Sequence, residues 1–295
     1  MKKILFMVGS GIGNQCETVP ALVRCIREWG KERIVVCNTY PHADHVTPVI
    51  FRQMVDEFVS FGSINPEDYD FQIMTYISKI HPVPSVQPKP KQAMIDRISE
   101  VEWNMSATGL EWTDDDLGQC GTSMSDIEPF KDAPDVIIHD GYNRTACQPP
   151  NRWEAKSYPQ WSVVAQQLKE KGYTVGSIGS TPEYVPATEN LTNLEFERSV
   201  AVLKGAKVVL SNDTGTFHVA NVLKKPNLVV FTFTSPIKNF DKRFHKNAVL
   251  VRRDLPCSPC QFTGKKFWIN NREKCKWKCR NIPPEEIVEK TCGLL

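Results

Sequence analysis

The sequence predicts an α/β fold built from two Rossmann-like, doubly wound domains that face each other across a cleft. Short apolar runs alternate with amphipathic helical segments along the whole chain, which is the pattern of parallel sheets covered by helices. The chain has 295 residues, which is long for one compact domain and suits two of about 130 to 160 residues each. Asp132, Ala133 and Pro134 precede a fresh apolar run, so we expect a first domain over residues 1–133 and a second over 134–295.

In the first half, the apolar run at residues 4–8 predicts a strand and the segment 17–29 predicts a helix. The apolar residues of this helix recur at helical spacing and would form one buried face: Val19, Leu22, Val23, Ile26 and Trp29. Further strands are predicted at residues 33–37, 57–60 and 71–76, and a helix at 92–103. The stretch 81–90 is rich in proline, which suits neither a helix nor a central strand and predicts a loop.

The second half repeats the alternation of strands and helices. Strands are predicted at residues 135–139, 173–178, 206–211 and 228–233, and helices at 160–171, 195–204 and 216–223. Pro283 and Pro284 suit the first turn of a last helix that reaches Lys290. We expect this helix to pack back on the first domain.

The composition argues against two classes of partner. Hydrophobic residues make up 41% of the chain, charged residues 24%, and the net charge is +2, so no strong field favours nucleic acid or an anionic membrane. The apolar run at residues 4–8 is too short for a signal peptide, and no run reaches the roughly eighteen apolar residues of a spanning helix. We therefore expect a cytoplasmic protein without a transmembrane segment and without a nucleic-acid partner.

The turn after the strand at 206–211 is the most informative stretch. Asn212, Asp213, Thr214 and Gly215 supply cap-forming side chains and a small residue just before a helix. Unpaired N–H groups at such a helix start attract phosphate, although an ordinary capped helix has the same sequence pattern. His218 lies one turn into the helix, on the face that looks back toward the turn. The convergence of these groups on one strand end favours an anion site.

Three groups of residues, in this order along the chain, resemble the heptosyltransferase-like glycosyltransferases of family 9. The first is Gly11-Ile12-Gly13-Asn14 with the following Thr18-Val19-Pro20-Ala21-Leu22; the second is Val136–His139 with Lys156-Ser157-Tyr158-Pro159 and Trp161; the third is Asp213-Thr214-Gly215, His218, Ala220, Pro226 and Thr234-Ser235-Pro236. Together they span most of the chain.

The resemblance implies a GT-B fold, with an acceptor on the first domain and a nucleotide-diphosphate sugar donor on the second. It implies a glycosyltransferase without a catalytic metal or other cofactor, and inversion at the anomeric carbon. The sugar expected first is a heptose from an ADP-linked donor, transferred to a saccharide or glycolipid acceptor in lipopolysaccharide or surface-glycan synthesis. A glycolipid acceptor would bring the protein into peripheral contact with a membrane.

Sugar transfer requires stabilisation of a leaving diphosphate. The residues expected at the donor are Lys156, Glu183, Asp213, Thr214, Gly215, His218, Thr234 and Ser235. Lys156 holds the family's lysine position and would place a charge on the phosphate, with Arg152 as the alternative. Thr214 and Gly215 offer backbone N–H groups, Thr234 and Ser235 offer hydroxyls, and Glu183 would meet the ribose or base. Without the neighbouring family motif, Lys156 or Arg152 would be interpreted as a solvated surface residue.

The group that removes the acceptor proton is less clear from the sequence. Gly11 and Gly13 lie in the loop expected at the acceptor, and Asn14 stands where the family has an aspartate. An amide cannot act as a base, so the catalytic candidates are Asn14 for orientation and Glu17 or Asp140 for proton removal. Each carboxylate reads equally well as a helix cap or a solvated group. A non-catalytic nucleotide-sugar-binding protein is the rival interpretation.

Four of the ten cysteines have the spacing of a metal knuckle. Cys257 and Cys260 form one close pair, and Cys275 and Cys279 form a second. In a reducing compartment a structural zinc, or iron, is favoured over two disulfides, with unliganded thiols as the other alternative. A protein-modifying glycosyltransferase that docks its acceptor on this knuckle is a third interpretation. The acidic triplet Asp114-Asp115-Asp116 is expected to be a solvated turn rather than a metal site.

Overall fold

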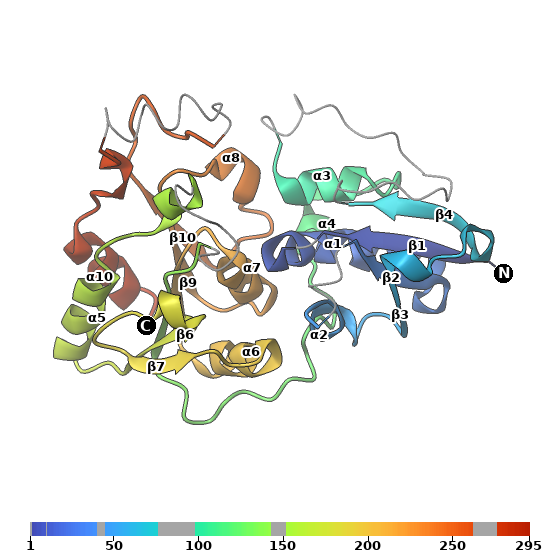
Figure 1. The fold of residues 1–295 in the computed structure, drawn as a ribbon. Helices are drawn as coiled ribbons and strands as arrows, with labels where there is room; N and C mark the ends of the chain where they lie inside the picture. Colours follow the sequence, from blue (N-terminus) through green and yellow to red (C-terminus); the bar gives the residue numbers. More distant parts are fainter. Residues whose placement is uncertain (1, 10, 40–44, 76–97, 143–151, 262–275) are drawn as a thin grey trace. The chain divides into compact units, whose positions relative to one another are not determined.

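The computed structural model describes residues 2–9, 11–39, 45–75, 98–142, 152–261 and 276–295, and the chain forms two compact units (Figure 1). Unit 1 comprises Met1–Glu128 and Phe240–Lys246, and unit 2 comprises Pro129–Asn239 and Asn247–Leu295. The chain therefore leaves unit 1 slightly before the boundary predicted after residue 133, and it returns to unit 1 for one short segment. The return of residues 240–246 to unit 1 was not predicted from the sequence.

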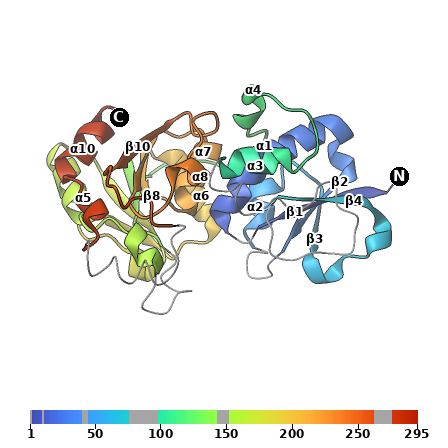
Figure 2. The same cartoon turned by 90° about the horizontal axis from the view of Figure 1, so that it is seen from above.

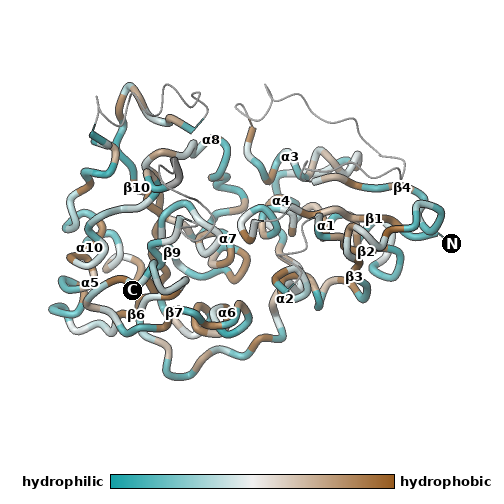
Figure 3. The backbone as a smooth tube through the Cα atoms, viewed as in Figure 1, coloured by the Kyte–Doolittle hydropathy of each residue, from teal (hydrophilic) through white to brown (hydrophobic). Residues whose placement is uncertain are grey.

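Unit 1 is built on a four-stranded sheet of order β3-β2-β1-β4, in which all pairs are parallel. Its strands are β1 (Lys3–Val8), β2 (Ile34–Asn38), β3 (Glu57–Ser60) and β4 (Tyr69–Met74), close to the predicted positions. β1 and β2 are buried almost throughout, because helices cover a parallel sheet on both faces. Figure 3 shows hydrophobic residues running along these strands.

The helices of unit 1 depart from the prediction at one important place. α1 (Ile12–Trp29) begins well before residue 17, with Gly11 as its N-cap residue, so Gly13 and Asn14 lie in the first helical turn and not in a loop. The other helices are α2 (Thr47–Phe51), which was not predicted, α3 (Glu100–Ser106) and α4 (Asp114–Leu117), with 3₁₀ turns at Lys31–Arg33, Phe61–Ser63 and Pro66–Asp68. The predicted loop at 81–90 and the first half of the predicted helix at 92–103 lie outside the described residues.

Unit 2 contains a six-stranded parallel sheet of order β10-β9-β8-β5-β6-β7. The strands are β5 (Val136–His139), β6 (Val175–Gly179), β7 (Glu189–Thr192), β8 (Val208–Asn212), β9 (Asn227–Phe231) and β10 (Ala248–Arg252). Counted from β5, this is the doubly wound order of dinucleotide-binding folds, and the order reverses between β5 and β8. β7 and β10 were not predicted, because both are edge strands whose residues are mostly exposed or half-buried.

Helices complete unit 2, as Figure 2 shows from above. They are α5 (Trp161–Glu170), α6 (Phe196–Gly205), α7 (Gly215–Val222), α8 (Pro236–Asn239) and α10 (Pro284–Cys292), with 3₁₀ turns at Arg152–Lys156, Thr181–Glu183 and Lys278–Arg280. The last helix, α10, packs on α5 within unit 2, and Tyr158 donates to the carbonyl of Ile282 over 2.7 Å. Both units thus have the predicted α/β class with parallel sheets. No helix in the described part of the chain combines the length and apolar character needed to span a bilayer.

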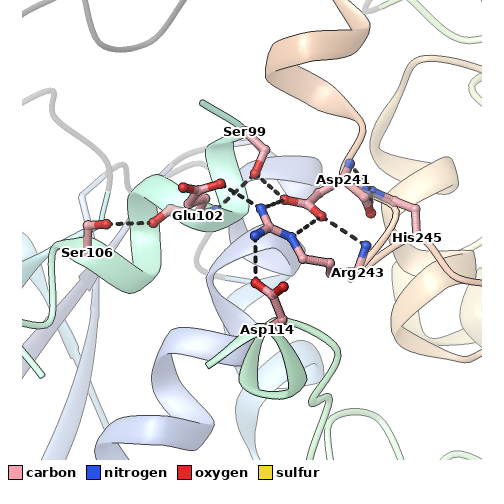
Figure 4. Close-up of polar contacts among 7 residues, drawn as sticks. All are labelled: Ser99, Glu102, Ser106, Asp114, Asp241, Arg243 and His245. Carbon is pink, nitrogen blue, oxygen red and sulfur yellow. Dashed lines mark hydrogen bonds and ion pairs between the residues drawn. The ribbon is translucent and has the colours of Figure 1, made fainter. Parts of the chain in front are cut away.

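Arg243 fastens the returning segment Phe240–Lys246 to the rest of unit 1 (Figure 4). Its guanidinium donates to both oxygens of Asp241 over 2.9 and 2.7 Å, to Glu102 over 2.6 Å and to Asp114 over 2.8 Å. Ser99 donates to Asp241 over 2.6 Å. Burial alone would raise the pKa of Asp241, but the bonds from Arg243 and Ser99 outweigh it and hold that pKa below its usual value.

The acidic triplet is solvated in part, since Asp114 and Asp115 are exposed and Asp116 is buried. Asp114 pairs with Arg243, and Asp116 closes a capping box with Thr113 and pairs with Arg27. The prediction of solvated residues therefore holds for Asp114 and Asp115 and was wrong for Asp116, because the local sequence does not reveal its pairing with the distant Arg27.

Replacing Arg243 by Met should destabilise unit 1 by about 2 kcal/mol. The substitution keeps most of the aliphatic stem but leaves the Asp241 carboxylate, whose side chain is 5% exposed, without its cation. Urea unfolding followed by circular dichroism measures the loss.

Arg252→Met is the matched control, since it removes an ion pair with Asp254 whose side chains are 42% and 80% exposed. We expect it to cost less than about 0.5 kcal/mol. Equal losses in the two variants would contradict the structural role assigned to Arg243.

Asp135 joins the starts of three neighbouring strands of unit 2. Its Oδ2 accepts from the backbone N–H and the hydroxyl of Thr174, both over 2.9 Å, and Lys207 Nζ lies 2.8 Å from its Oδ1. The hydrogen bond from Lys207 and those from Thr174 lower the pKa of Asp135 to about 2. A carboxyl with a depressed pKa adds stability above the pKa of the unfolded chain and loses it as the pH falls through the folded value.

The Asp135→Asn variant should accordingly be less stable than wild type at neutral pH by about 1 kcal/mol, after allowance for solvent screening at this site. The difference should shrink as the pH falls from about 4 toward about 2, where wild type loses the same contribution. Urea midpoints across this range measure it, with Asp132→Asn as an exposed control. A constant difference at every pH would refute the assignment.

Candidate functional site

The candidate site lies where the strand order of unit 2 reverses. β5 and β8 are parallel neighbours, with His139 opposite Ser211 in the register, so the loops that follow them start at the same edge of the sheet. The β5 loop begins with Asp140 and Gly141, and the β8 loop contains Asp213 and Thr214. Open parallel sheets bind ligands at such a switch point, beyond the carboxyl ends of the strands.

Asp213 is the charged centre of the site. It is 2% exposed, and its carboxylate lies 3.5 Å from Lys156 Nζ and 3.7 Å from His218 Nε2. Lys156 also donates to the backbone carbonyl of Asp213 over 2.8 Å, and Asn239 Nδ2 donates to its Oδ2 over 2.7 Å. Burial would raise the pKa of Asp213, but Lys156, His218 and Thr234 outweigh it, so the pKa is far below its usual value. The residue is an ionised, buried carboxylate.

Asn212 fixes the turn that carries Lys156. Its side chain is fully buried, and its Oδ1 accepts from the backbone N–H of Tyr158 over 3.1 Å and from the indole of Trp161 over 3.2 Å. Its Nδ2 donates to Asp140 over 2.9 Å. Buried amides need such partners, so Asn212 couples the start of α5 to both strand ends.

Asp140, predicted as a catalytic candidate, takes part in this network. Its Oδ1 accepts from Asn212 Nδ2 and from Ser157 Oγ, both over 2.9 Å. Its position at the end of β5 places it at the switch point. Asp140 therefore helps to hold the two strand ends together, whether or not it also takes part in a reaction.

His139 and Glu183 form a second pair beside Thr214. His139 Nδ1 lies 3.1 Å from Thr214 Oγ1, and its Nε2 lies 3.7 Å from Glu183 Oε2. Glu183 is 7% exposed and accepts from the N–H and the hydroxyl of Ser180, both over 2.8 Å. Burial opposes ionisation of Glu183, but His139 and Ser180 outweigh it and lower its pKa to about 2.

Two glycines make room for this pair. A Cβ at Gly141 would collide with the His139 imidazole, and a Cβ at Gly179 would lie 2.8 Å from Glu183 Oε2 and 2.9 Å from the imidazole Cδ2. Gly179 also has φ +121°, which side chains rarely adopt. Glycine is thus required at both positions by the neighbouring imidazole and carboxylate.

The other predicted donor residues lie close by in the fold. Gly215 is the first residue of α7, and Thr214 is its N-cap residue. Thr234 and Ser235 follow β9 and are buried at 1% and 2% exposure, and Ser235 N donates to Gln261 Oε1 over 2.9 Å. The structure thus brings Lys156, Asp213, His218 and Thr234 together. The side chain of Arg152, the alternative cation, lies outside the described residues.

Three residues of the site were not identified as such from the sequence. Asn239 carries no sequence signal, since it is remote from Asp213 along the chain. His139 could have been found, because it ends a strand of a doubly wound sheet, where ligands gather. Asn212 was recognised only as a helix cap, although its side chain serves the Tyr158–Trp161 turn.

The acceptor-side candidates belong to unit 1. Gly11, Gly13 and Asn14 lie at the start of α1, at the end of β1, and a Cβ on Gly11 would lie 3.3 Å from Asn14 Nδ2. Glu17 is 3% exposed, and its backbone carbonyl accepts from Asn104 Nδ2 over 3.1 Å. Glu17 is therefore a buried residue of the helix rather than a solvated first-turn acid.

The cysteine motif is described in part. Cys275 lies outside the described residues, and Cys260 Sγ donates to the backbone carbonyl of Cys257 over 2.8 Å. Cys260 and Trp277 pack against the same small cluster, formed by Ala155 and Phe233. Within the described part of the chain, the sulfurs of Cys257, Cys260 and Cys279 are not gathered within 4.8 Å of one another.

Comparison with known proteins finds a family match that falls mostly within unit 2. Residues 137–268 match the profile of glycosyltransferase family 9 (heptosyltransferase). Lipopolysaccharide heptosyltransferase 1 of Pseudomonas aeruginosa is 32% identical over 157 residues, which cover 49% of this chain and 41% of that protein. The matched stretch therefore spans less than half of the relative's own length.

Two solved structures share the fold. Escherichia coli ADP-heptose lipopolysaccharide heptosyltransferase II superposes with a TM-score of 0.63 and 16% identity, over 99% of this chain and 98% of that one. The iron-containing dodecameric glycosyltransferase TibC of enterotoxigenic E. coli gives a TM-score of 0.63 and 16% identity, over 88% of this chain and 65% of that one. At these identities the likeness establishes an α/β fold of the GT-B class. Together with the family match, it identifies residues 137–268 as a glycosyltransferase family 9 (heptosyltransferase) domain.

Proposed function

We propose that the protein is a glycosyltransferase that moves a sugar from a nucleotide-diphosphate donor to a saccharide or glycolipid acceptor in lipopolysaccharide or surface-glycan synthesis. The observation that supports this proposal most directly is that Lys156, Asp213 and His218 lie together where the strand order of the family 9 domain reverses. ADP-heptose is the donor proposed first, because the relatives and neighbours are named as heptosyltransferases. A glycolipid acceptor would bring the protein from the cytoplasm into peripheral contact with a membrane.

The leaving diphosphate carries the charge that must be stabilised. In this proposal the N–H groups at Thr214 and Gly215 and the ammonium of Lys156 receive it. Asp213 is the counter-charge that holds Lys156, through contacts of 2.8 Å to its carbonyl and 3.5 Å to its carboxylate. The cation is thus oriented by the protein before the donor arrives. Thr234 and Ser235 line the adjoining strand end, and Glu183 supports the loop after β6 that would meet the ribose or base.

The acceptor hydroxyl must lose a proton as it attacks the anomeric carbon. Asn14 has no basic atom, so we assign it hydrogen bonding to the acceptor, with Gly11 and Gly13 allowing close approach. Glu17 and Asp140 are the two carboxylates proposed as the base. In the variants Glu17→Gln and Asp140→Asn, only loss of the true base should abolish turnover while leaving donor binding intact.

Turnover should depend on Lys156. On purified protein with saccharide acceptors, the release of nucleoside diphosphate from ADP-, GDP- and UDP-sugars identifies the donor. Lys156→Ala should lower turnover about 100-fold or more, the usual cost of losing one charge-stabilising group. Asp213→Asn should lower it too, because Lys156 and His218 lose their counter-charge.

Lys290→Ala is the matched control, since its side chain is 41% exposed on α10 and pairs along the helix with Glu286. Thermal denaturation of all variants separates loss of folding from loss of chemistry. Equal turnover in Lys156→Ala and Lys290→Ala would refute the donor site. Binding of a nucleotide sugar without turnover on any acceptor would favour the non-catalytic interpretation.

We further propose that Cys257, Cys260, Cys275 and Cys279 hold one structural zinc or iron ion. The proposal is supported by the spacing of the two pairs, by the packing of Cys260 and Trp277 on one cluster, and by the iron content of the TibC neighbour. Metal binding would draw the sulfurs together, as it does in sites that order on binding. The ion would fix this segment beside Phe233 and takes no part in the chemistry.

Elemental analysis of protein produced in metal-supplemented medium should find about one zinc or iron per chain. Cys257→Ser should lose the metal because one thiolate ligand is removed. Cys292→Ser, a half-buried cysteine on α10 outside the motif, should retain it. Metal-free wild-type protein with unchanged thermal stability would rule out the structural ion.

A further inference from the structure

The hydroxyl of Thr214 does not serve the helix that it precedes. Thr214 is the N-cap residue of α7, where a threonine side chain ordinarily accepts from an N–H two or three residues on, but it makes no such bond. Its Oγ1 lies 3.1 Å from His139 Nδ1 instead. The hydroxyl is therefore committed to the imidazole, at the helix start proposed to receive the donor's diphosphate.

The other side of the imidazole faces a carboxylate. Glu183 Oε2 lies 3.7 Å from His139 Nε2, and the side chains of His139 and Glu183 are 13% and 9% exposed. Tyr142 N donates to Glu183 Oε1 over 3.3 Å, and Ser180 holds Oε2. An ionised carboxylate at Nε2 favours a hydrogen there, which leaves Nδ1 as an acceptor in the neutral ring. The threonine then donates its hydrogen to His139 and has none left for a phosphate oxygen.

A second proton on the imidazole reverses this bond. Nδ1 then carries a hydrogen and donates it to Thr214 Oγ1, so that the hydroxyl hydrogen can turn toward an anion. The imidazolium also lies between Glu183, its counter-charge, and the helix start. Other charged groups near this point are Asp140, which interacts with Arg280, and Asp213, which pairs with both Lys156 and His218. Glu154 also interacts with Arg280.

We propose that His139 is a positioning residue that takes up a proton from solvent when the nucleotide-sugar diphosphate binds, and thereby frees the hydroxyl of Thr214 to donate to it. This inference rests on the proposed donor site. One N–H bond forms at His139 Nδ1, and the Thr214-to-His139 hydrogen bond becomes a His139-to-Thr214 bond. The close fit of Gly141 and Gly179 around the ring keeps it between its two partners.

Isothermal titration calorimetry tests the coupling, with ADP-glucose, GDP-glucose and UDP-glucose as probes. Their phosphates are fully esterified and, unlike a terminal phosphate with a pKa of about 6, do not themselves titrate near neutral pH. Titrations between about pH 6 and about pH 8, in a pair of buffers with different ionisation enthalpies, count the protons taken up. Wild type should take up as much as about one proton per nucleotide sugar and lose affinity up to about tenfold per pH unit as the pH rises.

Three variants separate the explanations. In His139→Asn the amide can donate to or accept from Thr214 in either rotamer, so binding should persist without proton uptake and without pH dependence. Thr214→Val should also lose the uptake, because the coupling passes through the hydroxyl. His45→Asn, at an exposed histidine of unit 1, should match wild type.

Equal proton uptake in wild type, His139→Asn and Thr214→Val would overturn this inference and leave the donor site standing. Wild-type binding that is independent of pH would do the same. Failure of wild type to bind any of the three nucleotide sugars, and ADP-heptose as well, would reject the proposed function, and this inference with it. Circular dichroism checks the folding of each variant. If either His139→Asn or Thr214→Val is misfolded, the proton uptake of the other variant tests the inference.

Discussion

The reversal of strand order between β5 and β8 is the constraint on which the site in unit 2 depends. At such a point the chain leaves two neighbouring strands toward opposite faces of the sheet, so the two loops diverge. The polar groups at these strand ends are then not covered by a neighbouring crossover connection. Side chains must supply the missing partners. Asn212 does so by bonding Tyr158, Trp161 and Asp140 at once. The geometry of the site follows from the need to give these polar groups hydrogen-bond partners.

The charges at the site are organised by the protein itself. A buried carboxylate is costly unless cations and hydrogen bonds compensate it, and Asp213 has Lys156, His218 and Asn239 around it. The same contacts fix the ammonium of Lys156 in one place. Groups that are aimed in advance stabilise a developing charge without reorganisation when the reaction occurs. In the proposed donor site the carboxylate would act through the cation that it holds rather than on the substrate.

The fold class could be predicted from the sequence because each buried strand and amphipathic helix is a local pattern. The turn at Asp213 to His218 was also readable, since its residues lie within a few positions of one another. Asn239 and Arg243 were not, because their partners are far away along the chain and nothing in the local sequence specifies them. The start of α1 was misplaced because glycines suggested a loop, whereas Gly11 caps the helix and Gly13 lies inside it.

The returning segment Phe240–Lys246 has a consequence for the way this protein can be divided. Neither unit is one continuous stretch of chain, so a fragment cut after Glu128 would lack Arg243 and leave Glu102 and Asp114 without the guanidinium that joins them. Asn239, the partner of Asp213, is the last residue before that segment. Exchange of the whole of unit 2 between related genes would therefore need junctions on both sides of residues 240–246. A single crossover after Glu128 would instead join residues 1–128 of one parent to the fastening segment of the other.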